Sequence, residues 1–438
     1  MEFLRLCRGV FAWLRRSGRA SAVALLFTVW HTEAVSIPPT PIITLEQAWQ
    51  LAEQANPALR AAEATFATAE GELRDARALL WNNPELSTGW RSRNVPQTGN
   101  PAQTQREWTA GIAQRFEIAG QQGARRTATE RALAATRELV ADTRRQVRAE
   151  VEQRFVRVLS LQLRIETEGQ TLKLIEEAAG AVRKRVATGE DSRLDGNLAS
   201  VEAERARNQL ASLREQLVQS RAELAAALQL PDQALPEVSG ALDVKAAAYG
   251  LDDLLASTDE RPLLRALDYQ EEAARARLAL ERAVRYPDIT VGLNTGREGS
   301  ADLRERVAGV SVMLPLPLFR RNGGGIGRAV TDLTQAEIEK QAGRRDTRAQ
   351  VLALWERLRN LRERVARLQE SVLPGLEENQ RLVTSSFRAG EIGLLQLLLV
   401  NRQVLEGRRD LLEARTELRR VSVALEAAAG WHQADSSR

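Results

Sequence analysis

Apolar residues recur along residues 124–228 at steps of mostly seven, four and three, the spacing of one apolar stripe on a helix. The stripe breaks once, from Val186 to Asp195, and no proline lies between Pro101 and Pro231. It consists of Leu133, Val140, Val147, Val151, Phe155, Val158, Ile165, Leu172, Ile175, Ala179, Val182 and Val186, then Leu194, Leu198, Val201, Leu210, Leu213, Leu217, Leu224 and Leu228. A helix of about 60 residues is about 90 Å long. We therefore predict a long antiparallel hairpin, a rod whose stripe needs partner helices.

The order of elements repeats at about half of the chain length. Pro57 and Pro262 are 205 positions apart, and Gly189 and Gly390 are 201 apart. The predicted division is a signal peptide at 1–34, a first repeat at 42–231, a linker at 232–250, a second repeat at 251–430 and a tail at 431–438. Each repeat is expected to hold a helix, two short strands and a long helical hairpin.

Each repeat opens on a helix. In the first, Thr44 is the expected N-cap with Gln47 in the capping-box position, and the helix continues past Pro57 to about Trp81. The second opens at Leu251 and continues to about residue 285. Its long hairpin has an apolar stripe over 351–372, an expected kink at Pro374, a break at 387–393 and a return through 394–425.

Two segments of alternating polarity follow the opening helix in each repeat. Their apolar faces contain Leu86, Thr88 and Trp90, then Trp108, Ala110, Ile112 and Phe116; in the second repeat they contain Ile289, Val291 and Leu293, then Ala308, Val310, Val312 and Leu314. Polar loops are expected at 94–106 and 296–306. Each run is about ten residues long, the length of a membrane strand.

An open sheet cannot sit in lipid, because unpaired edge groups cost several kcal/mol each. Bacterial barrels contain at least about eight strands, so four strands in one chain predict a barrel shared between chains. Trp90, Trp108 and Phe116 are then candidates for membrane-interface aromatics, with core packing as the alternative. The other interpretation of the four segments is a small soluble β-domain on a coiled-coil stalk.

The charge distribution argues against a nucleic-acid partner. The formal net charge is +4, but residues 1–34 contribute +3, and the arginines of the long helices alternate with acidic residues. Residues 1–34 contain a basic region ending at Arg19, an apolar core from Ala22 to Trp30 and a candidate cleavage segment at 32–34, the pattern of a secretory signal. The alternative is a disordered basic N-terminus. The only cysteine, Cys7, precedes the apolar core, and export of a mature chain without cysteine is compatible with a bacterial periplasm or outer membrane.

The chemistry of an enzyme is missing from the sequence. Cys7, His31 and His432 are the only cysteine and histidines, and they lie in the predicted signal and tail. The glycine run at 323–327 lacks the Lys and Ser/Thr of a phosphate loop. We therefore predict no enzyme activity, no cofactor and no dedicated metal site.

The sequence resembles the TolC-type outer-membrane efflux channel family over residues 42–430. The resemblance rests on Leu45-Glu46-Gln47-Ala48 with Asn56-Pro57, on the repeated order of elements, and on the breaks at 186–195 and 387–390. A narrower similarity to the cobalt–zinc–cadmium branch rests on residues 116–121 and 314–322.

This resemblance implies a mainly α fold with a small β part. Long helical hairpins form a coiled-coil tunnel in the periplasm, and four strands per chain contribute to a 12-stranded barrel of a homotrimer in outer-membrane lipid. The implied partners are a periplasmic adaptor and an inner-membrane resistance-nodulation-division pump. Aspartates that ring the closed mouth in some relatives are replaced here by Gln396 and Leu399, which argues against an acidic ring at the second tip.

The two breaks are expected to be the helix tips, where Gly189 and Gly390 let the backbone turn. The residues expected to dock an adaptor there are Thr188, Gly189, Arg193, Asp195, Ala389, Gly390 and Gly393. The predicted function is a passive exit channel of a tripartite efflux system, with divalent heavy-metal cations as the expected substrate. The alternatives are drug or protein export by the same kind of channel, and a secreted coiled-coil scaffold or adhesin without a pore.

Overall fold

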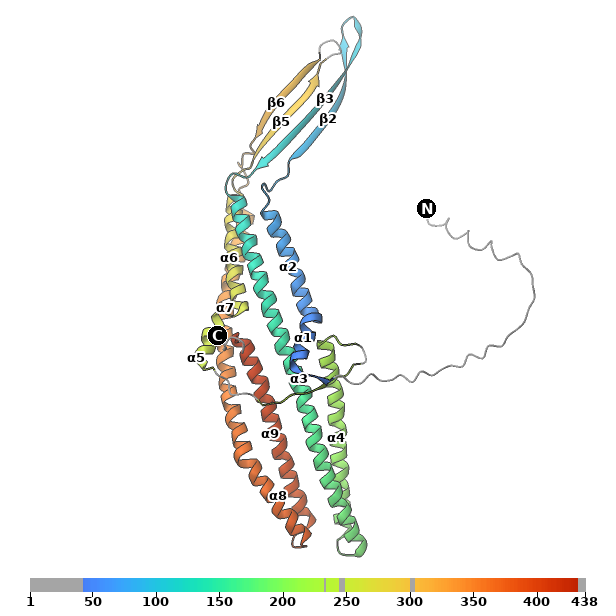
Figure 1. The fold of residues 1–438 in the computed structure, drawn as a ribbon. Helices are drawn as coiled ribbons and strands as arrows, with labels where there is room; N and C mark the ends of the chain where they lie inside the picture. The colour runs from blue at the N-terminus through green and yellow to red at the C-terminus, as the bar shows by residue number, and fades with distance from the viewer. Residues whose placement is uncertain (1–41, 232–233, 244–248, 300–303, 432–438) are drawn as a thin grey trace, which may run out of the picture. The chain divides into compact units, whose positions relative to one another are not determined.

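The computed structural model describes residues 42–231, 234–243, 249–299 and 304–431 (Figure 1). The predicted signal peptide and nearly all of the predicted tail lie outside these residues. All of the described residues belong to one compact unit, Thr40–Arg438.

The described elements follow the same order twice, helix pair, strand pair and long helical hairpin, with a short parallel pair of strands, β1 and β4, beside them. The first set is β1 Ile42–Ile43, α1 Leu45–Ala55, α2 Pro57–Ala76, β2 Glu85–Gln97, β3 Asn100–Phe116, α3 Gln121–Thr188, α4 Arg193–Ala227 and β4 Glu237–Val238. The second set is α5 Leu251–Asp259, α6 Pro262–Ala283, β5 Ile289–Glu298, β6 Glu305–Met313, α7 Gly323–Arg367, the π-helical turn η1 Leu368–Val372, α8 Leu373–Arg388 and α9 Leu394–Ala429.

Local capping explains where the first helices begin. The Thr44 hydroxyl accepts a hydrogen bond from Gln47 N, and the Gln47 side chain accepts one from Thr44 N, which confirms the predicted capping box. The predicted single helix is divided at Asn56, which ends α1 and caps α2 through hydrogen bonds from Ala58 N and Leu59 N. Proline follows directly because the first helical position needs no N–H donor.

The predicted rod is present as α3 and α4. At 68 residues, α3 is about 100 Å long. Most of its predicted stripe is buried, with Val151, Phe155, Val158 and Val182 at most 3% exposed. On α4, Leu194 stays 76% exposed, so part of the stripe remains without a partner in one chain.

The second hairpin differs from the first by a π-helical turn. Leu373 N–H donates to Leu368 O, five residues back, directly before Pro374. Pro374 has no N–H to donate and its ring clashes with the carbonyl of Glu370, so the regular α-helical ladder is interrupted there. The predicted irregularity at Pro374 is therefore a π turn followed by α8.

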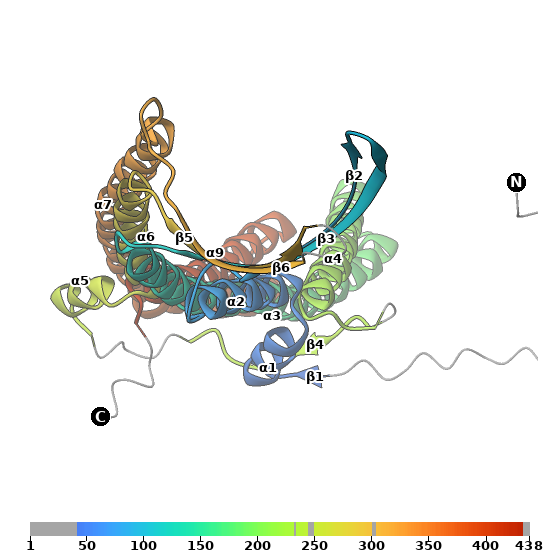
Figure 2. The same cartoon turned by 90° about the horizontal axis from the view of Figure 1, so that it is seen from above.

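The four long strands form one antiparallel sheet in the order β2-β3-β5-β6, curved when viewed from above (Figure 2). The predicted faces are confirmed by the register, in which Leu86 lies opposite Ile112 and Trp90 opposite Trp108. The predicted loop at 94–106 is wrong, because pairing continues through most of it to a tight turn at Gly99, which has a φ of +84°. Polar residues can extend a hairpin beyond an apolar stretch, since the ladder satisfies their backbone groups.

None of the described helices has a stretch that is both long and apolar enough to cross a bilayer.

Candidate functional site

The first helix tip is a tight, internally bonded turn between α3 and α4. Gly189 has a φ of +82°, a conformation that glycine adopts without strain, and Glu190 N–H donates to Arg185 O at 2.9 Å. Ser192 caps α4: its hydroxyl accepts from Asp195 N at 3.2 Å, and the Asp195 carboxylate accepts from Ser192 N at 3.3 Å. This tip is therefore held by its own side chains.

The second tip, between α8 and α9, repeats this geometry with fewer side-chain bonds. Gly390 has a φ of +76°, and Glu391 N–H donates to Ser386 O at 2.9 Å. The residue that begins α9, in the place that Ser192 has in the first repeat, is Gly393, which makes no side-chain cap. The first turn of α9 thus lacks the stabilisation that Ser192 gives to α4.

The two tips contact each other within one chain. The Arg185 guanidinium lies over the Phe387 ring at 5.7 Å from its centroid and also pairs with Asp191 at 3.1 Å. A small apolar cluster of Ala179, Val182, Ala199 and Leu394, with Phe387 packed against it, joins the hairpins just above the turns. The tips of one chain therefore form a single surface.

The predicted tip residues lie together in this surface. Thr188, Gly189, Arg193, Ala389, Gly390 and Gly393 are exposed, whereas Asp195 is half-buried and its carboxylate is used in the cap. Arg185 and Ser192 were missed by sequence reasoning. The Ser192-to-Asp195 spacing was the available signal for the cap, whereas nothing in the sequence indicates that Arg185 reaches Phe387.

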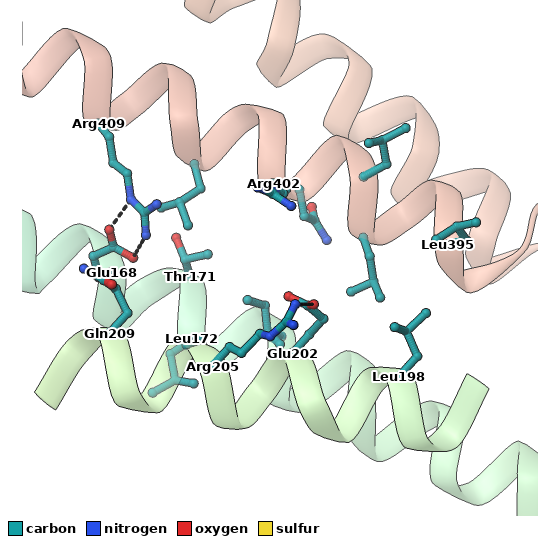
Figure 3. Close-up of a pocket in the computed structure, with 16 residues that line it drawn as sticks. Glu168, Thr171, Leu172, Leu198, Glu202, Arg205, Gln209, Leu395, Arg402 and Arg409 are labelled. Carbon is teal, nitrogen blue, oxygen red and sulfur yellow. Dashed lines mark hydrogen bonds and ion pairs between the residues drawn. The ribbon is translucent and has the colours of Figure 1, made fainter. Parts of the chain in front are cut away.

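Above the tips, α3, α4 and α9 enclose a groove of about 450 Å³ (Figure 3). Glu168 of α3 accepts hydrogen bonds from both Nε and Nη2 of Arg409 on α9, the latter at 2.7 Å. The Glu168 side chain is only 5% exposed, so its charge depends on this partner. Leucines, among them Leu172, Leu198 and Leu395, line much of the remaining wall.

A second buried carboxylate ties the same two helices further from the tips. Glu152 of α3 accepts a hydrogen bond from Arg419 of α9. Burial raises the pKa of Glu152, and the attraction of Arg419 opposes that shift only in part. The Glu152–Arg419 and Glu168–Arg409 pairs hold α9 of the second repeat against α3 of the first.

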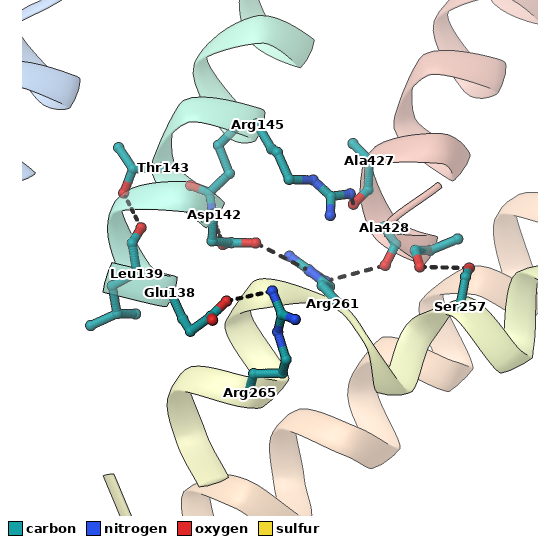
Figure 4. Close-up of polar contacts among 12 residues, drawn as sticks. Glu138, Leu139, Asp142, Thr143, Arg145, Ser257, Arg261, Arg265, Ala427 and Ala428 are labelled. Atoms are coloured by element: carbon teal, nitrogen blue, oxygen red, sulfur yellow. Dashed lines mark hydrogen bonds and ion pairs between the residues drawn. The ribbon is translucent and has the colours of Figure 1, made fainter. Parts of the chain in front are cut away.

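The end of α9 far from the tips is fixed by a polar cluster (Figure 4). Its last carbonyls accept hydrogen bonds from other elements: Ala427 O from Arg145, Ala428 O from Arg261 and Ala429 O from Ser257. Burial lowers the pKa of Arg145. Cations at a helix C-terminus are favourable, so the cluster secures the two repeats to each other.

The sheet has one apolar and one polar face. The apolar face carries the row Leu86, Ile112, Leu293 and Val310, one residue from each strand. Leu86 and Val310 are more than 70% exposed. An exposed apolar face of this extent in a single chain marks a surface for lipid or for another protein.

The polar face carries glycines and small hydroxyl residues. It includes Gly89, Gly111, Gly292, Gly296 and Gly309, all of which follow from the register. Beside β3 and β5 these glycines leave a hollow of about 290 Å³ lined by Ser87, Thr109 and Asn294, among others. The two faces therefore suit two different environments.

The three predicted interface aromatics all lie on the apolar face, but not at one level. Trp90 and Trp108 are directly opposite each other, whereas Phe116 is eight positions further along β3, about 27 Å at 3.4 Å per residue. Between Trp108 and Phe116, the residues of β3 that lie on the same face are Ala110, Ile112 and Gln114. An apolar band in membrane barrels is about 25 Å tall, so these aromatics bracket a band of roughly membrane height.

Two long helical hairpins continued by a sheet with one apolar face define a subunit of a helical duct joined to a membrane barrel. The sequence matches the family described as outer membrane efflux protein over residues 48–229 and 255–431. It is 30% identical over 366 residues, 84% of this chain and 85% of the relative, to the cobalt-zinc-cadmium resistance protein CzcC of Cupriavidus metallidurans. It is 26% identical to the nickel-cobalt-cadmium resistance protein NccC of Alcaligenes xylosoxydans, covering 78% of this chain and 76% of that protein.

The fold is similar to that of the outer membrane protein VceC of Vibrio cholerae, with a TM-score of 0.74 and 19% identity over 88% of this chain and 96% of that one. The chain belongs to the outer membrane efflux protein family. It is therefore an efflux channel of the bacterial outer membrane whose helical hairpins extend into the periplasm. Family members work with a periplasmic adaptor and a pump, and they are not enzymes.

Proposed function

We propose that this chain forms a homotrimeric exit channel that passively conducts divalent heavy-metal cations out of the cell. The observation that carries the metal assignment is the match of most of the chain to CzcC, whose name describes it as a cobalt-zinc-cadmium resistance protein. Three chains supply twelve strands, above the minimum of about eight for a bacterial barrel. The exposed stripe residues of α4, such as Leu194, then pack against a neighbouring chain.

In this trimer the apolar face of the sheet contacts lipid and the polar face lines the passage. Small residues such as Gly292 and Gly296 suit the inside of a curved sheet. Within the described part of the chain, no group of three or more His, Cys, Asp or Glu side chains could hold a metal ion. In the proposed system an inner-membrane resistance-nodulation-division pump supplies the energy.

The helix tips are the proposed docking surface of the adaptor. The exposed turn residues Thr188 and Gly189 lie beside the second tip, so that one adaptor hairpin can contact both. A Cβ added at Gly189 meets no atom within 4 Å, so a side chain there projects into solvent. The two tips differ in their caps, which gives the adaptor two distinguishable contacts.

Gly189→Trp tests the docking surface, with Gly189→Ala as its matched control. Both variants place a side chain at a positive φ and share a strain of about 1–2 kcal/mol, but only tryptophan adds bulk. We expect Gly189→Trp to abolish export while Gly189→Ala largely retains it, with normal trimer assembly in both. Normal export by Gly189→Trp would refute docking at the tips.

The substrate is tested by the susceptibility of a deletion strain to cobalt, zinc, cadmium, copper, nickel, several drugs and detergents. Sensitivity to metals alone, restored by the gene, supports the proposal. Sensitivity to drugs alone would support the channel but would show that its substrates are drugs and not metals. Conductance in planar bilayers separates a channel from a scaffold or adhesin, which conducts nothing.

A further inference from the structure

The apolar face of the sheet ends, on the side away from the helices, in a row of tryptophans and arginines. The register places Trp90, Trp108, Arg297 and Arg306 side by side across β2, β3, β5 and β6. Arg106 lies two positions beyond Trp108 on the same face. Among the described residues, the side chains of Arg106, Arg297 and Arg306 have no hydrogen-bond or ion-pair partner.

The carboxylates at this level lie on the polar face only, whereas arginines lie on both faces. Within the paired strand segments, every charged residue on the apolar face is one of these three arginines. The nearby carboxylates of Glu107, Glu298 and Glu305 all lie on the polar face, each one position away in sequence from an arginine. The apolar face therefore carries three uncompensated positive charges.

Two of these charges face each other directly. Arg297 and Arg306 are partners in the antiparallel register, where Cβ atoms are about 4.5–5.5 Å apart. Like charges in this position destabilise a sheet, and no carboxylate on the same face relieves them. An anion from outside the chain would turn this repulsion into two favourable contacts.

The position of the row indicates which anion this is. Phe116 and the helices lie at the opposite end of the apolar band, and the helices extend into the periplasm. The arginine row is therefore at the membrane surface that faces the cell exterior. Tryptophan rings prefer the headgroup level of a bilayer, and guanidinium groups bind phosphate through paired hydrogen bonds.

We propose that Trp90, Trp108, Arg106, Arg297 and Arg306 form a binding surface for the phosphate groups of a lipid in the outer leaflet. The proposal rests on the lipid-facing orientation of the apolar face in the proposed channel. The tryptophans set the depth of the lipid headgroup, and the Arg297–Arg306 pair holds its phosphate. The lipid in turn fixes the height of the barrel in the membrane.

The test compares Arg297→Gln/Arg306→Gln with Arg91→Gln/Arg93→Gln in the purified full chain. The second variant removes the same charge from the same sheet level, but from the polar face. Binding of diphosphorylated lipid A is measured by native mass spectrometry, with phosphatidylethanolamine as the zwitterionic probe and inorganic phosphate as competitor. We expect Arg297→Gln/Arg306→Gln to bind lipid A about 25-fold more weakly, about five-fold for each arginine, and the control to bind as the wild type does.

If both double variants lost the same affinity for lipid A, or if neither lost any, the proposed lipid-binding surface would be overturned. Displacement of lipid A by millimolar inorganic phosphate would overturn it too, because the site would then bind free anions. Conductance recorded on the same preparations separates this inference from the proposed function. If the wild type conducts but does not prefer lipid A over phosphatidylethanolamine, only the lipid-binding surface is refuted. If the wild type does not conduct, the proposed channel function is refuted.

Discussion

Replacing Arg409 by methionine tests whether the buried ion pair with Glu168 holds the two hairpins together. The Glu168 carboxylate is 5% exposed and accepts two hydrogen bonds from Arg409, so the substitution leaves a buried charge without its main partner. Such a loss costs about 3–5 kcal/mol. Arg164 Nε lies 4.0 Å from the same carboxylate and offsets part of this cost. We therefore expect Arg409→Met to lower the free energy of unfolding by about 3 kcal/mol.

Arg402→Met is the matched control, because Arg402 borders the same groove on the same helix. Its guanidinium pairs with Glu406 within α9, and both side chains are more than half exposed. Exposed pairs of this kind contribute about 0.3–0.5 kcal/mol. The double variant Glu168→Leu/Arg409→Met removes both charges and should recover most of the lost stability, because an apolar pair replaces the ion pair.

The assays are denaturant unfolding followed by circular dichroism and conductance in planar bilayers. Because the pair joins α3 to α9, Arg409→Met should also raise conductance, whereas Arg402→Met should not. A loss in Arg409→Met of less than about 1 kcal/mol would mean that Glu168 is not desolvated. Unchanged conductance with lower stability would show that the pair supports the fold without restricting the passage of ions.

Two further predictions concern the first tip and the second buried pair. Ser192→Ala should destabilise the start of α4 by about 1 kcal/mol, and Ser192→Gly by a few tenths, which hydrogen exchange in the first turn of α4 measures. Glu152 has a raised pKa, so it contributes stability below its ordinary value of 4.5 that is lost as pH rises through the folded pKa. Glu152→Gln should therefore gain stability relative to the wild type as pH rises from about 4 to about 7, measured by denaturant unfolding. A difference in free energy of unfolding between the two that does not change with pH would contradict this.

The sequence was sufficient to predict the features that depend on spacing along the chain. The stripe of α3, the turns at Gly189 and Gly390 and the faces of the strands follow from periods of 3.6 and 2 and from glycine's freedom at positive φ. Each of these depends on residues that are near each other in sequence.

The ties between the repeats could not be predicted in this way. Glu168 and Arg409 are 241 positions apart, and the helices contain many similar acidic and basic residues. Which of them are buried depends on how α9 packs against α3, which the period of one helix does not specify. The extension of β2 and β3 was missed because polar strands lack the apolar alternation by which strands are recognised.

The π-helical turn at Leu368–Val372 makes the second hairpin mechanically different from the first. Such a turn accommodates one residue more than an α-helical turn, and one residue corresponds to a rotation of about 100° around the helix axis. The side chains of α8 are thus offset in phase from those of α7, and a slip of the hydrogen bonds by one residue would turn α8 about its own axis without unwinding it. The uninterrupted α3 has no such point, so torsion applied at the tips is absorbed in the second hairpin and transmitted by the first.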